Sequence, residues 1–336
     1  MASSSPPPAG MYVPVPTFFA SKKTASYDAV TSPLDIETQG AHAVYLAKAG
    51  IRGIVALGST GEAVHLHPRD RARVLGGIKA ALEKEGFRDY PIVAGTATNS
   101  VEETVEQLKD AHEAGAQWGL CLVPGYNAAV TTQDGIIRWF TAVADQSPIP
   151  VMIADKSLPS YHYPGVSNNV KVVPSTYATL SKHRNIVGCK LSHGDVSYHA
   201  QIGANPAIDA EHFHAFTGLG QQLLPVMSVG FSGAIDGSAG FFPKTLVRLY
   251  ELSAKAQPTE AEAVERRLLQ FKVSSMEEIV VRYGTVGIKE AVGRLRGFGD
   301  ADGTRLPLFG GIPGGDAEWA NWKPVLDAVD EVEKSL

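Results

Sequence analysis

Cysteine is scarce in this sequence of 336 residues, which contains only Cys121 and Cys189. The two residues form no Cys-x-x-Cys pair, and each lies in an apolar run. This pattern excludes a disulfide framework, and we expect two buried, reduced thiols.

Long hydrophobic runs are also absent. No stretch reaches the roughly 18 apolar residues that a membrane-spanning helix needs. Residues 1–10 (MASSSPPPAG) contain neither the basic segment nor the apolar core of a signal peptide. We therefore expect residues 1–10 to be a disordered leader, and the protein to be cytoplasmic with no membrane partner.

Charge of one sign is not in large excess either. The 30 Lys and Arg residues are set against 35 Asp and Glu residues, which gives a net charge of −5. Because this balance provides no basic surface for nucleic acid, we expect no nucleic-acid partner. Hydrophobic residues make up 44% of the sequence, enough for a large buried core.

What the sequence does contain is a repeated alternation of short apolar runs and longer amphipathic segments. Nearly continuous apolar runs are typical of strands that are buried on both faces. Eight such runs begin near Tyr12, Gly53, Pro91, Trp118, Pro150, Asn185, Phe213 and Ser232. Helical spacing of apolar residues follows in segments such as 70–84, 101–115, 133–144 and 243–254.

This alternation predicts parallel strands joined by helices. Eight units close a (β/α)8 TIM barrel, an α/β fold that we place over residues 11–256. The alternative is an open doubly wound sheet, but the Gly-rich dinucleotide turn expected after its first strand is missing. Helical patterns over 259–283, 286–296 and 316–333 predict a C-terminal helical extension, residues 257–336, packed on the barrel.

Lys190 ends the sixth apolar run, and its position is chemically unusual. A lysine at the end of a buried strand is costly unless it is paired or neutral, and desolvation lowers its pKa. A neutral amine attacks carbonyl groups, whereas a rim lysine that extends into solvent is the alternative. Because neighbouring side chains on a strand point to opposite faces, a nucleophilic Cys189 is disfavoured, and we expect it to pack between strand and helix.

Other predicted strand ends carry polar groups. The segment GSTGE at 58–62 offers hydroxyls and backbone N–H groups that suit a small carboxylate, although a tight turn that needs glycine is the alternative. Tyr126 follows the fourth run, and Tyr161 follows the fifth. A tyrosine at a strand end can move protons between substrate oxygens, although simple half-buried packing is common for tyrosine.

Together these motifs resemble the dihydrodipicolinate synthase/N-acetylneuraminate lyase family over about residues 13–247. The resemblance is carried by GSTGE at 58–62, IVAGTATNSVEETVE at 92–106, PGYN at 124–127, YHYPG at 161–165 and NIVGCK at 185–190. The ordered set is specific, although no single motif is.

The resemblance implies a carbon–carbon lyase, a class I aldolase in which Lys190 forms a Schiff base with a 2-keto acid and no metal or other cofactor is used. Tyr161 would relay protons. Tyr126 would match a tyrosine that is often contributed across a subunit interface, in a homotetramer or homodimer. The residues expected to contact the pyruvate part of the substrate are Gly58, Ser59, Thr60, Gly218 and Ile235.

The sequence departs from the synthase branch of the family, which has an arginine shortly after the proline of YxxP to bind a second carboxylate. Residues 164–168 (PGVSN) contain none, and this favours a neutral polyol aldehyde. The surrounding sequence resembles the fungal L-threo-3-deoxy-hexulosonate aldolases. That resemblance implies cleavage of 2-keto-3-deoxy-L-galactonate to pyruvate and L-glyceraldehyde in galacturonate catabolism, with 4-hydroxy-2-oxoglutarate aldolase as the nearest rival.

Residues 154–160 (ADKSLPS) are a second departure, because the fifth strand of the family runs almost directly into the tyrosine. These extra residues could displace Tyr161 from the strand end, and Tyr163 would then be the fallback proton relay.

Two hypotheses come from other functional classes. His65 and His67 could bind a metal from one strand face, as in a metal-dependent aldolase, but no third ligand is evident. A non-catalytic sugar-acid binding protein would keep the carboxylate site yet need no lysine.

Overall fold

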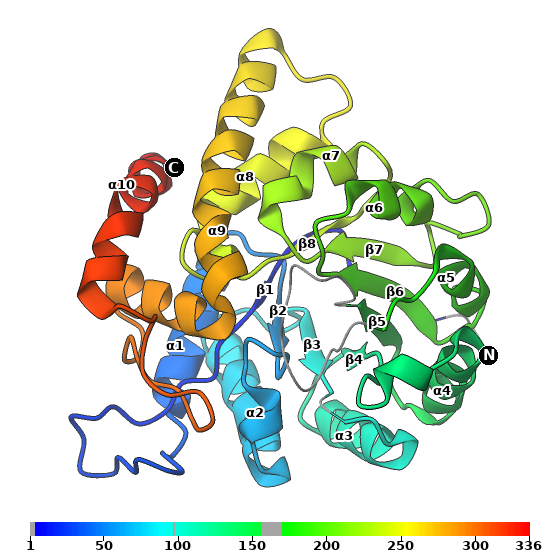
Figure 1. The fold of residues 1–336 in the computed structure, drawn as a ribbon, viewed down its shortest axis with the longest axis horizontal. Helices are drawn as coiled ribbons and strands as arrows, with labels where there is room; N and C mark the ends of the chain where they lie inside the picture. Colours follow the sequence, from blue (N-terminus) through cyan, green and yellow to red (C-terminus); the bar gives the residue numbers. More distant parts are fainter. Residues whose placement is uncertain (1–3, 97, 156–169) are drawn as a thin grey trace.

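The computed structural model describes residues 4–96, 98–155 and 170–336. Its centre is a closed barrel of eight parallel strands in sequence order (Figure 1). The strands are β1 Gly10–Pro14, β2 Gly53–Ala56, β3 Ile92–Gly95, β4 Trp118–Leu122, β5 Val151–Asp155, β6 Ile186–Leu191, β7 His214–Thr217 and β8 Gly233–Ile235. The predicted TIM barrel is therefore confirmed, and the open doubly wound sheet is wrong.

Helices surround the barrel because each strand must return over the sheet to start the next parallel strand. They are α1 Ile36–Lys48, α2 Pro68–Lys84, α3 Val101–Glu113, α4 Gln133–Gln146, α5 Pro174–Leu180, α6 Val196–Gly203, α7 Leu223–Met227 and α8 Pro243–Ala254. In α3, Ser100 caps the N-terminus by accepting a hydrogen bond from the Glu103 N–H. The apolar positions Val105, Leu108 and Ala111 of this helix are buried.

Two cores hold the fold together. Inside the barrel, side chains from successive strands pack on one another, and the rings of Tyr12 and Phe216 meet edge to face with centroids 5.5 Å apart. A larger core lies between the strands and the helices and contains both cysteines, each fully buried. Burial raises the pKa of Cys121 to about 12 and also raises that of Cys189. The expectation of two buried, unpaired thiols is confirmed.

A β-bulge on β6 decides which side chains of this strand face the interior. Val151 pairs with Ile186 and Met152 with Gly188, so Val187 is the extra residue. Val187 consequently packs in the interior core, while Cys189 belongs to the outer core and Lys190 lines the barrel mouth. The expected placement of Cys189 between strand and helix is confirmed.

The N-terminal segment corrects one expectation. Residues 4–10 are not a disordered leader, because they cross the end of the barrel where the strands begin and form specific hydrogen bonds there. The Ser4 hydroxyl donates to Asn185 Oδ1 at 2.9 Å, and Trp118 Nε1 donates to the Ser5 carbonyl oxygen at 2.9 Å. His214 Nδ1 lies 2.8 Å from the Pro7 carbonyl oxygen.

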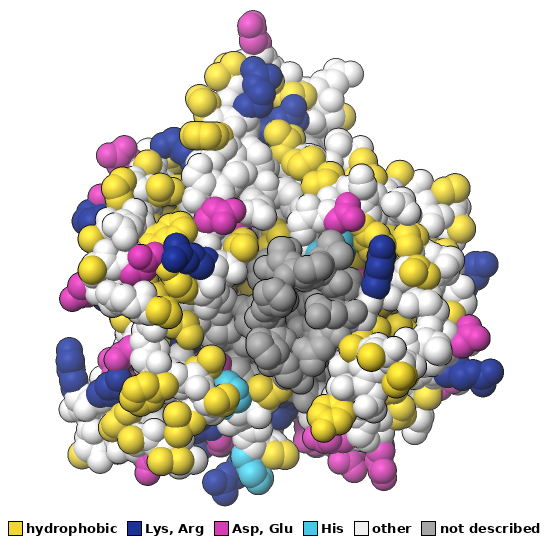
Figure 2. Space-filling view, in the orientation of Figure 1, with side chains coloured by type: hydrophobic (Ala, Val, Ile, Leu, Met, Phe, Trp, Pro, Cys, Tyr) yellow, Lys and Arg dark blue, Asp and Glu magenta, His cyan; other side chains and the backbone are white. Residues whose placement is uncertain are grey.

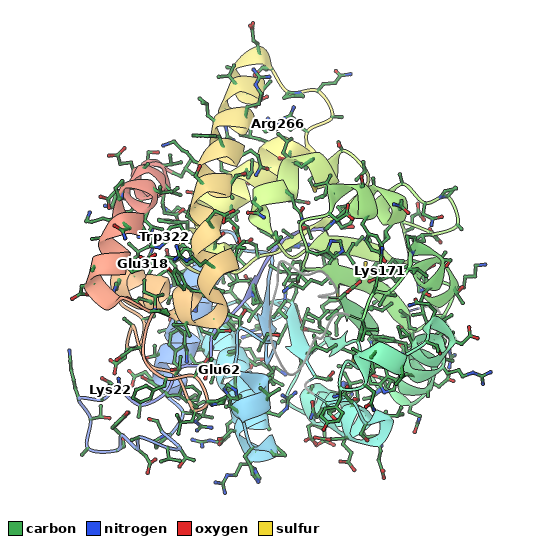
Figure 3. The ribbon with its side chains drawn as sticks, in the orientation of Figure 1. Lys22, Glu62, Lys171, Arg266, Glu318 and Trp322 are labelled. Carbon is green, nitrogen blue, oxygen red and sulfur yellow. The ribbon has the colours of Figure 1, made fainter. Side chains whose placement is uncertain are left out.

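The C-terminal extension consists of α9 Glu260–Arg296 and α10 Gly315–Ser335, which lie side by side against α8 (Figure 1). Helix α9 covers both of the predicted helical segments, 259–283 and 286–296, and it is interrupted between them at Gly284, whose φ of 54° is left-handed. Glu318 of α10 accepts a hydrogen bond from the Tyr283 hydroxyl of α9, which joins the two helices. It also accepts one from Trp322 Nε1 within α10 (Figure 3).

The surface carries both signs of charge. On the face in Figure 2, Lys and Arg side chains are interspersed with Asp and Glu side chains. Within the described ranges, no helix is both long and apolar enough to cross a bilayer.

Gly188→Ala is expected to lower stability by about 1–3 kcal/mol, the usual cost of overpacking a core. A Cβ atom at position 188 would lie 2.4 Å from the His214 carbonyl oxygen on the neighbouring strand. Gly194→Ala is the matched control, since its Cβ would meet no heavy atom within 4 Å. Thermal unfolding should show a lower midpoint for Gly188→Ala alone, and equal midpoints for the two variants would contradict this packing.

Candidate active site

A cavity opens where the barrel strands end at their C-terminal side, which is where TIM-barrel enzymes place their active sites. Among the described residues, its lining is Pro14, Val55, Gly58, Ser59, Thr60, Gly95, Thr96, Leu120, Leu122, Ala154 and Lys190. The structure thus brings together Lys190 and the Gly58-Ser59-Thr60 segment, which lie more than a hundred residues apart in the sequence. Lys190 is the one charged side chain in this described lining.

The environment of Lys190 favours a reactive amine. Its side chain lies among apolar neighbours from β2, β4 and β5, and this burial lowers its pKa to about 8, against the opposing charge of Asp236. At neutral pH a usable fraction of the amine is therefore unprotonated. The nucleophile interpretation thus has a physical basis that strand position alone could not supply.

Asp236 is a residue that the sequence analysis missed. It directly follows β8 and is fully buried, and it accepts hydrogen bonds from the backbone N–H groups of Gly220 at 2.5 Å and Ala239 at 3.0 Å. Its charge opposes the desolvation of Lys190. Its position in the run SGAIDGS, as a carboxylate at a strand end, was the available signal.

In the sequence, β5 precedes Tyr161 and Tyr163, the two tyrosines predicted as proton relay. Ala154, from the unexpected segment 154–160, pairs in register with Lys190 and lines the cavity beside it. Asp155 ends the strand, and its Oδ2 accepts a hydrogen bond from the Tyr177 hydroxyl at 2.7 Å. Both Tyr161 and the fallback Tyr163 lie outside the described residues.

The GSTGE segment forms a strained turn. Leu57, which directly precedes the segment, has a φ of 61°, and Glu62, its last residue, has a φ of 52°; both are left-handed. Neither Gly58 nor Gly61 has a positive φ, so the alternative of a tight turn that needs glycine gains no support from these φ angles. Gly95 is required nearby, because a Cβ atom there would lie 2.3 Å from the Leu57 carbonyl oxygen. The Thr17 hydroxyl donates to the Gly61 carbonyl oxygen at 2.7 Å and helps to hold the turn.

The remaining predicted site residues do not line this cavity as the structure describes it. Tyr126 is 81% exposed in the loop after β4. Ile235 packs in the interior core with Val187 and Phe216. Gly218 follows β7 and lies against Ser192, whose Oγ would be 2.2 Å from a Cβ at position 218.

The two histidines of the metal hypothesis are not on a strand. His65 ends a short 3-10 turn, Ala63–His65, and its Nδ1 lies 3.3 Å from Glu62 Oε2. His67 caps α2 and accepts a hydrogen bond from the Arg69 N–H at 3.3 Å. Among residues 4–96, 98–155 and 170–336, no three His, Cys, Asp or Glu side chains gather in a way that could hold a metal ion.

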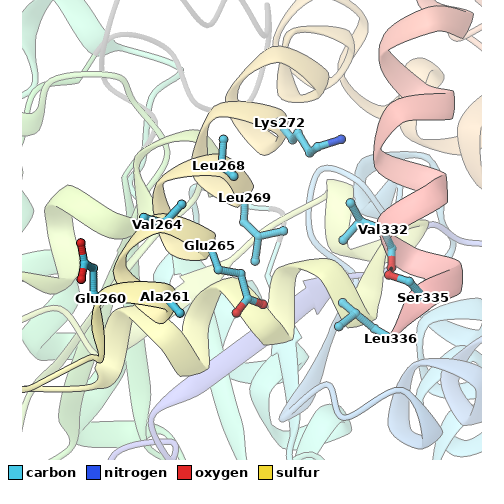
Figure 4. Close-up of a pocket in the computed structure, with 10 residues that line it drawn as sticks. All are labelled: Glu260, Ala261, Val264, Glu265, Leu268, Leu269, Lys272, Val332, Ser335 and Leu336. Atoms are coloured by element: carbon cyan, nitrogen blue, oxygen red, sulfur yellow. Dashed lines mark hydrogen bonds between the residues drawn. The ribbon is translucent and has the colours of Figure 1, made fainter.

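A larger groove lies elsewhere, between the first half of α9 and the end of α10 (Figure 4). Its volume is about 730 Å³, and its lining is mainly apolar, with Val264, Leu268 and Leu336 at the surface. Because it lies away from the strand ends and the nucleophile, we assign the active site to the smaller cavity at Lys190.

Comparison with known proteins identifies the family. Residues 26–310 match the Dihydrodipicolinate synthetase family. A protein of Emericella nidulans named "Probable 4-hydroxy-2-oxoglutarate aldolase, mitochondrial" is 34% identical over 86% of each chain. The L-threo-3-deoxy-hexylosonate aldolase of Aspergillus niger is 32% identical and covers 97% of this chain and 96% of its own.

The fold has solved counterparts. A dihydrodipicolinate synthase family protein from Coccidioides immitis superimposes with a TM-score of 0.81 at 28% identity, over 99% of both chains. The dihydrodipicolinate synthase of Thermotoga maritima superimposes with a TM-score of 0.80 at 21% identity, which bears on the fold alone. The family expected from the ordered motifs is confirmed, and the chain belongs to the dihydrodipicolinate synthetase family.

Proposed function

We propose that this protein is a class I aldolase that cleaves a 2-keto-3-deoxy sugar acid to pyruvate and an aldehyde through a Schiff base on Lys190. The observation that carries the proposal is the location of Lys190, an amine with lowered pKa, in one cavity with the Ser59-Thr60 turn. The aldolase names of the similar fungal proteins support the reaction class.

The first half of the reaction uses the amine. Neutral Lys190 attacks the C2 ketone of the substrate, and loss of water leaves a protonated imine. The hydroxyls and backbone N–H groups of Ser59 and Thr60 hold the adjacent carboxylate, so that the ketone meets the amine at a fixed angle. A fixed carboxylate also holds C1 and C2 in place while the C3–C4 bond breaks.

The second half uses the imine as an electron sink. A base takes the proton of the C4 hydroxyl, the C3–C4 electron pair moves into the imine, and the aldehyde leaves. The remaining enamine is protonated at C3, and hydrolysis returns free Lys190 and pyruvate. The family resemblance assigns the base to Tyr161, and Tyr126 to the interface of a homodimer or homotetramer, where its exposure suits contact with a second subunit.

The substrate that we favour is 2-keto-3-deoxy-L-galactonate, which gives pyruvate and L-glyceraldehyde. The described cavity lining has no cation besides Lys190, and residues 164–168 contain no arginine, so no group for a second carboxylate is evident there. The Aspergillus niger relative carries the corresponding name. We also propose a cytoplasmic location.

A second candidate is 4-hydroxy-2-oxoglutarate, whose aldehyde half carries a carboxylate. The similarity to the Emericella nidulans protein of that name is as strong as the similarity to the hexylosonate aldolases. The two candidates therefore differ in whether the site must neutralise a second negative charge.

Pyruvate and borohydride should form a stable adduct on Lys190, detected by peptide mass spectrometry. Lys190→Ala should lose turnover to the level of a no-enzyme control while its thermal midpoint stays close to that of the native protein. Lys182→Ala, at an exposed position, is the matched control and should retain activity. Pyruvate binding without an adduct would instead indicate the non-catalytic sugar-acid binding protein.

The rate of adduct formation at low pyruvate should rise with pH up to about 8 and then level off. Burial lowers the pKa of Lys190 to about 8, and only the neutral amine attacks, so each unit below that value should cost about tenfold in rate. Cyanoborohydride trapping across the pH range measures this profile. A rate that continues to rise toward pH 10.5, the ordinary lysine value, would contradict the buried, neutral amine.

Pyruvate release should be fastest, by kcat/KM, with 2-keto-3-deoxy-L-galactonate in a panel that includes its C4 epimer and 4-hydroxy-2-oxoglutarate. A missing partner for a buried carboxylate typically costs several kcal/mol, so the second acid should be slower by about 100-fold or more. Equal or faster release from 4-hydroxy-2-oxoglutarate would select the rival substrate.

A further inference from the structure

Lys289 is a buried lysine, and it lies outside the cavity that contains Lys190. It belongs to the second half of α9, where its residue is 3% exposed. Its Nζ forms an ion pair with Glu62 Oε1 and donates to the Gly303 carbonyl oxygen at 2.6 Å. Glu62 is the last residue of the GSTGE turn, so the C-terminal extension contacts the segment that carries Ser59 and Thr60.

The carboxylate of Glu62 is bound on both oxygens. While Oε1 faces Lys289, Oε2 accepts the Arg305 N–H at 2.9 Å and lies 3.3 Å from His65 Nδ1. Although burial opposes it, the His65 hydrogen bond and the Lys289 charge lower the pKa of Glu62, which keeps the carboxylate ionised.

A second contact from the same helix reaches the turn independently. The Thr285 hydroxyl donates to the Ser59 carbonyl oxygen at 3.0 Å. Thr285 directly follows Gly284, where α9 is interrupted, so the interruption sets this residue at the start of the segment that faces the turn. Two residues of α9 therefore hold the turn at its second and fifth positions.

The contacts of Lys289 and Thr285 with the turn matter because the turn is strained. Glu62 has a left-handed backbone, a conformation that costs a residue other than glycine about 1–3 kcal/mol and persists only where the surroundings fix it. Of the side-chain contacts of Glu62, His65 comes from the barrel, whereas Lys289 and the Arg305 N–H both come from the extension. Loss of the two extension contacts would remove part of the support of the turn that carries Ser59 and Thr60.

We propose that Lys289, together with Thr285, is a positioning residue for the carboxylate site, and that the C-terminal extension is thereby part of the active site. The inference rests on the proposed function in one respect, namely that the turn binds the substrate carboxylate. Lys289 acts through Glu62 and does not touch the substrate.

A purely structural role makes a different prediction from a positioning role. Loss of a structural contact lowers the amount of folded protein or its thermal midpoint, but it leaves the affinity of the folded fraction unchanged. Loss of a positioning contact weakens binding of the carboxylate in particular. The comparison of pyruvate with pyruvamide, which has the ketone but no carboxylate, separates these two roles.

The test measures the concentration of each ketone that half-saturates borohydride trapping on Lys190. For Lys289→Met we expect this concentration to rise about tenfold or more for pyruvate and to change little for pyruvamide. Thr285→Val, which removes one hydroxyl donor with little change of shape, should raise it about threefold to tenfold for pyruvate. The maximal trapping rate should be nearly unchanged in both.

Lys272→Met is the matched control. Lys272 is also on α9 and also donates to the extension, at 2.8 Å to the Ala328 carbonyl oxygen, but it does not contact the turn. This variant should behave like the native protein with both ketones. A double variant, Glu62→Gln with Lys289→Met, should bind pyruvate no worse than Lys289→Met alone, because the two residues act as one unit.

Each outcome decides the inference. The inference would be overturned if folded Lys289→Met and Thr285→Val had the same half-saturating concentration of pyruvate as the native protein. It would also be overturned if this concentration rose equally for pyruvate and pyruvamide. If Lys289→Met does not fold, Thr285→Val alone decides, since it leaves the ion pair intact. A native protein that forms no pyruvate adduct would overturn the proposed function, whereas an intact native adduct with no shift in the variants would overturn only the positioning role.

Discussion

Desolvation of the Lys190 amine is the constraint on which the site depends. A barrel mouth lined by Val55, Leu120 and Leu122 cannot hold a charged ammonium group at low cost, so the amine gives up its proton more readily than a surface lysine. The bulge at Val187 is what turns Lys190 inward on β6. Because Gly188 has no side chain, β6 and β7 can approach closely at this position.

The half-buried Lys190 and the buried Lys289 differ in what surrounds the amine. Burial lowers the pKa of both. Lys289 has a carboxylate in direct contact, Glu62, which keeps it paired and charged, whereas Lys190 has Asp236 as an opposing charge and apolar neighbours in its cavity. Removing one partner of a buried ion pair leaves an uncompensated charge, which is why such a pair resists distortion. We thus propose the same residue type as a nucleophile at one position and as a positioning residue at the other.

Much of this arrangement could be predicted from the sequence, because barrel folds have a strong local signature. Apolar runs identified all eight strands, and alternation along β6 correctly assigned Cys189 and Lys190 to opposite faces. The proximity of Lys190 to the GSTGE turn followed from the rule that active sites form where parallel strands end.

The features that could not be predicted depend on contacts between residues far apart in the sequence, which no local sequence pattern reveals. The order in residues 4–10 comes from side chains at the starts of β4 and β7, more than a hundred residues away. The left-handed conformations of Leu57 and Glu62 run against local preference, and Glu62 has contacts from Lys289 and Arg305, more than 200 residues away in the sequence. The register of Ala154 beside Lys190 likewise results from the pairing of β5 with β6.

The ion pair between Glu62 and Lys289 joins residues separated by 227 positions. A ribosome therefore makes the GSTGE turn long before it makes the residues of α9 that contact it. All eight barrel strands precede α9 in the sequence. The strained turn can thus gain its ion pair with Lys289 only after every strand of the barrel has been synthesised.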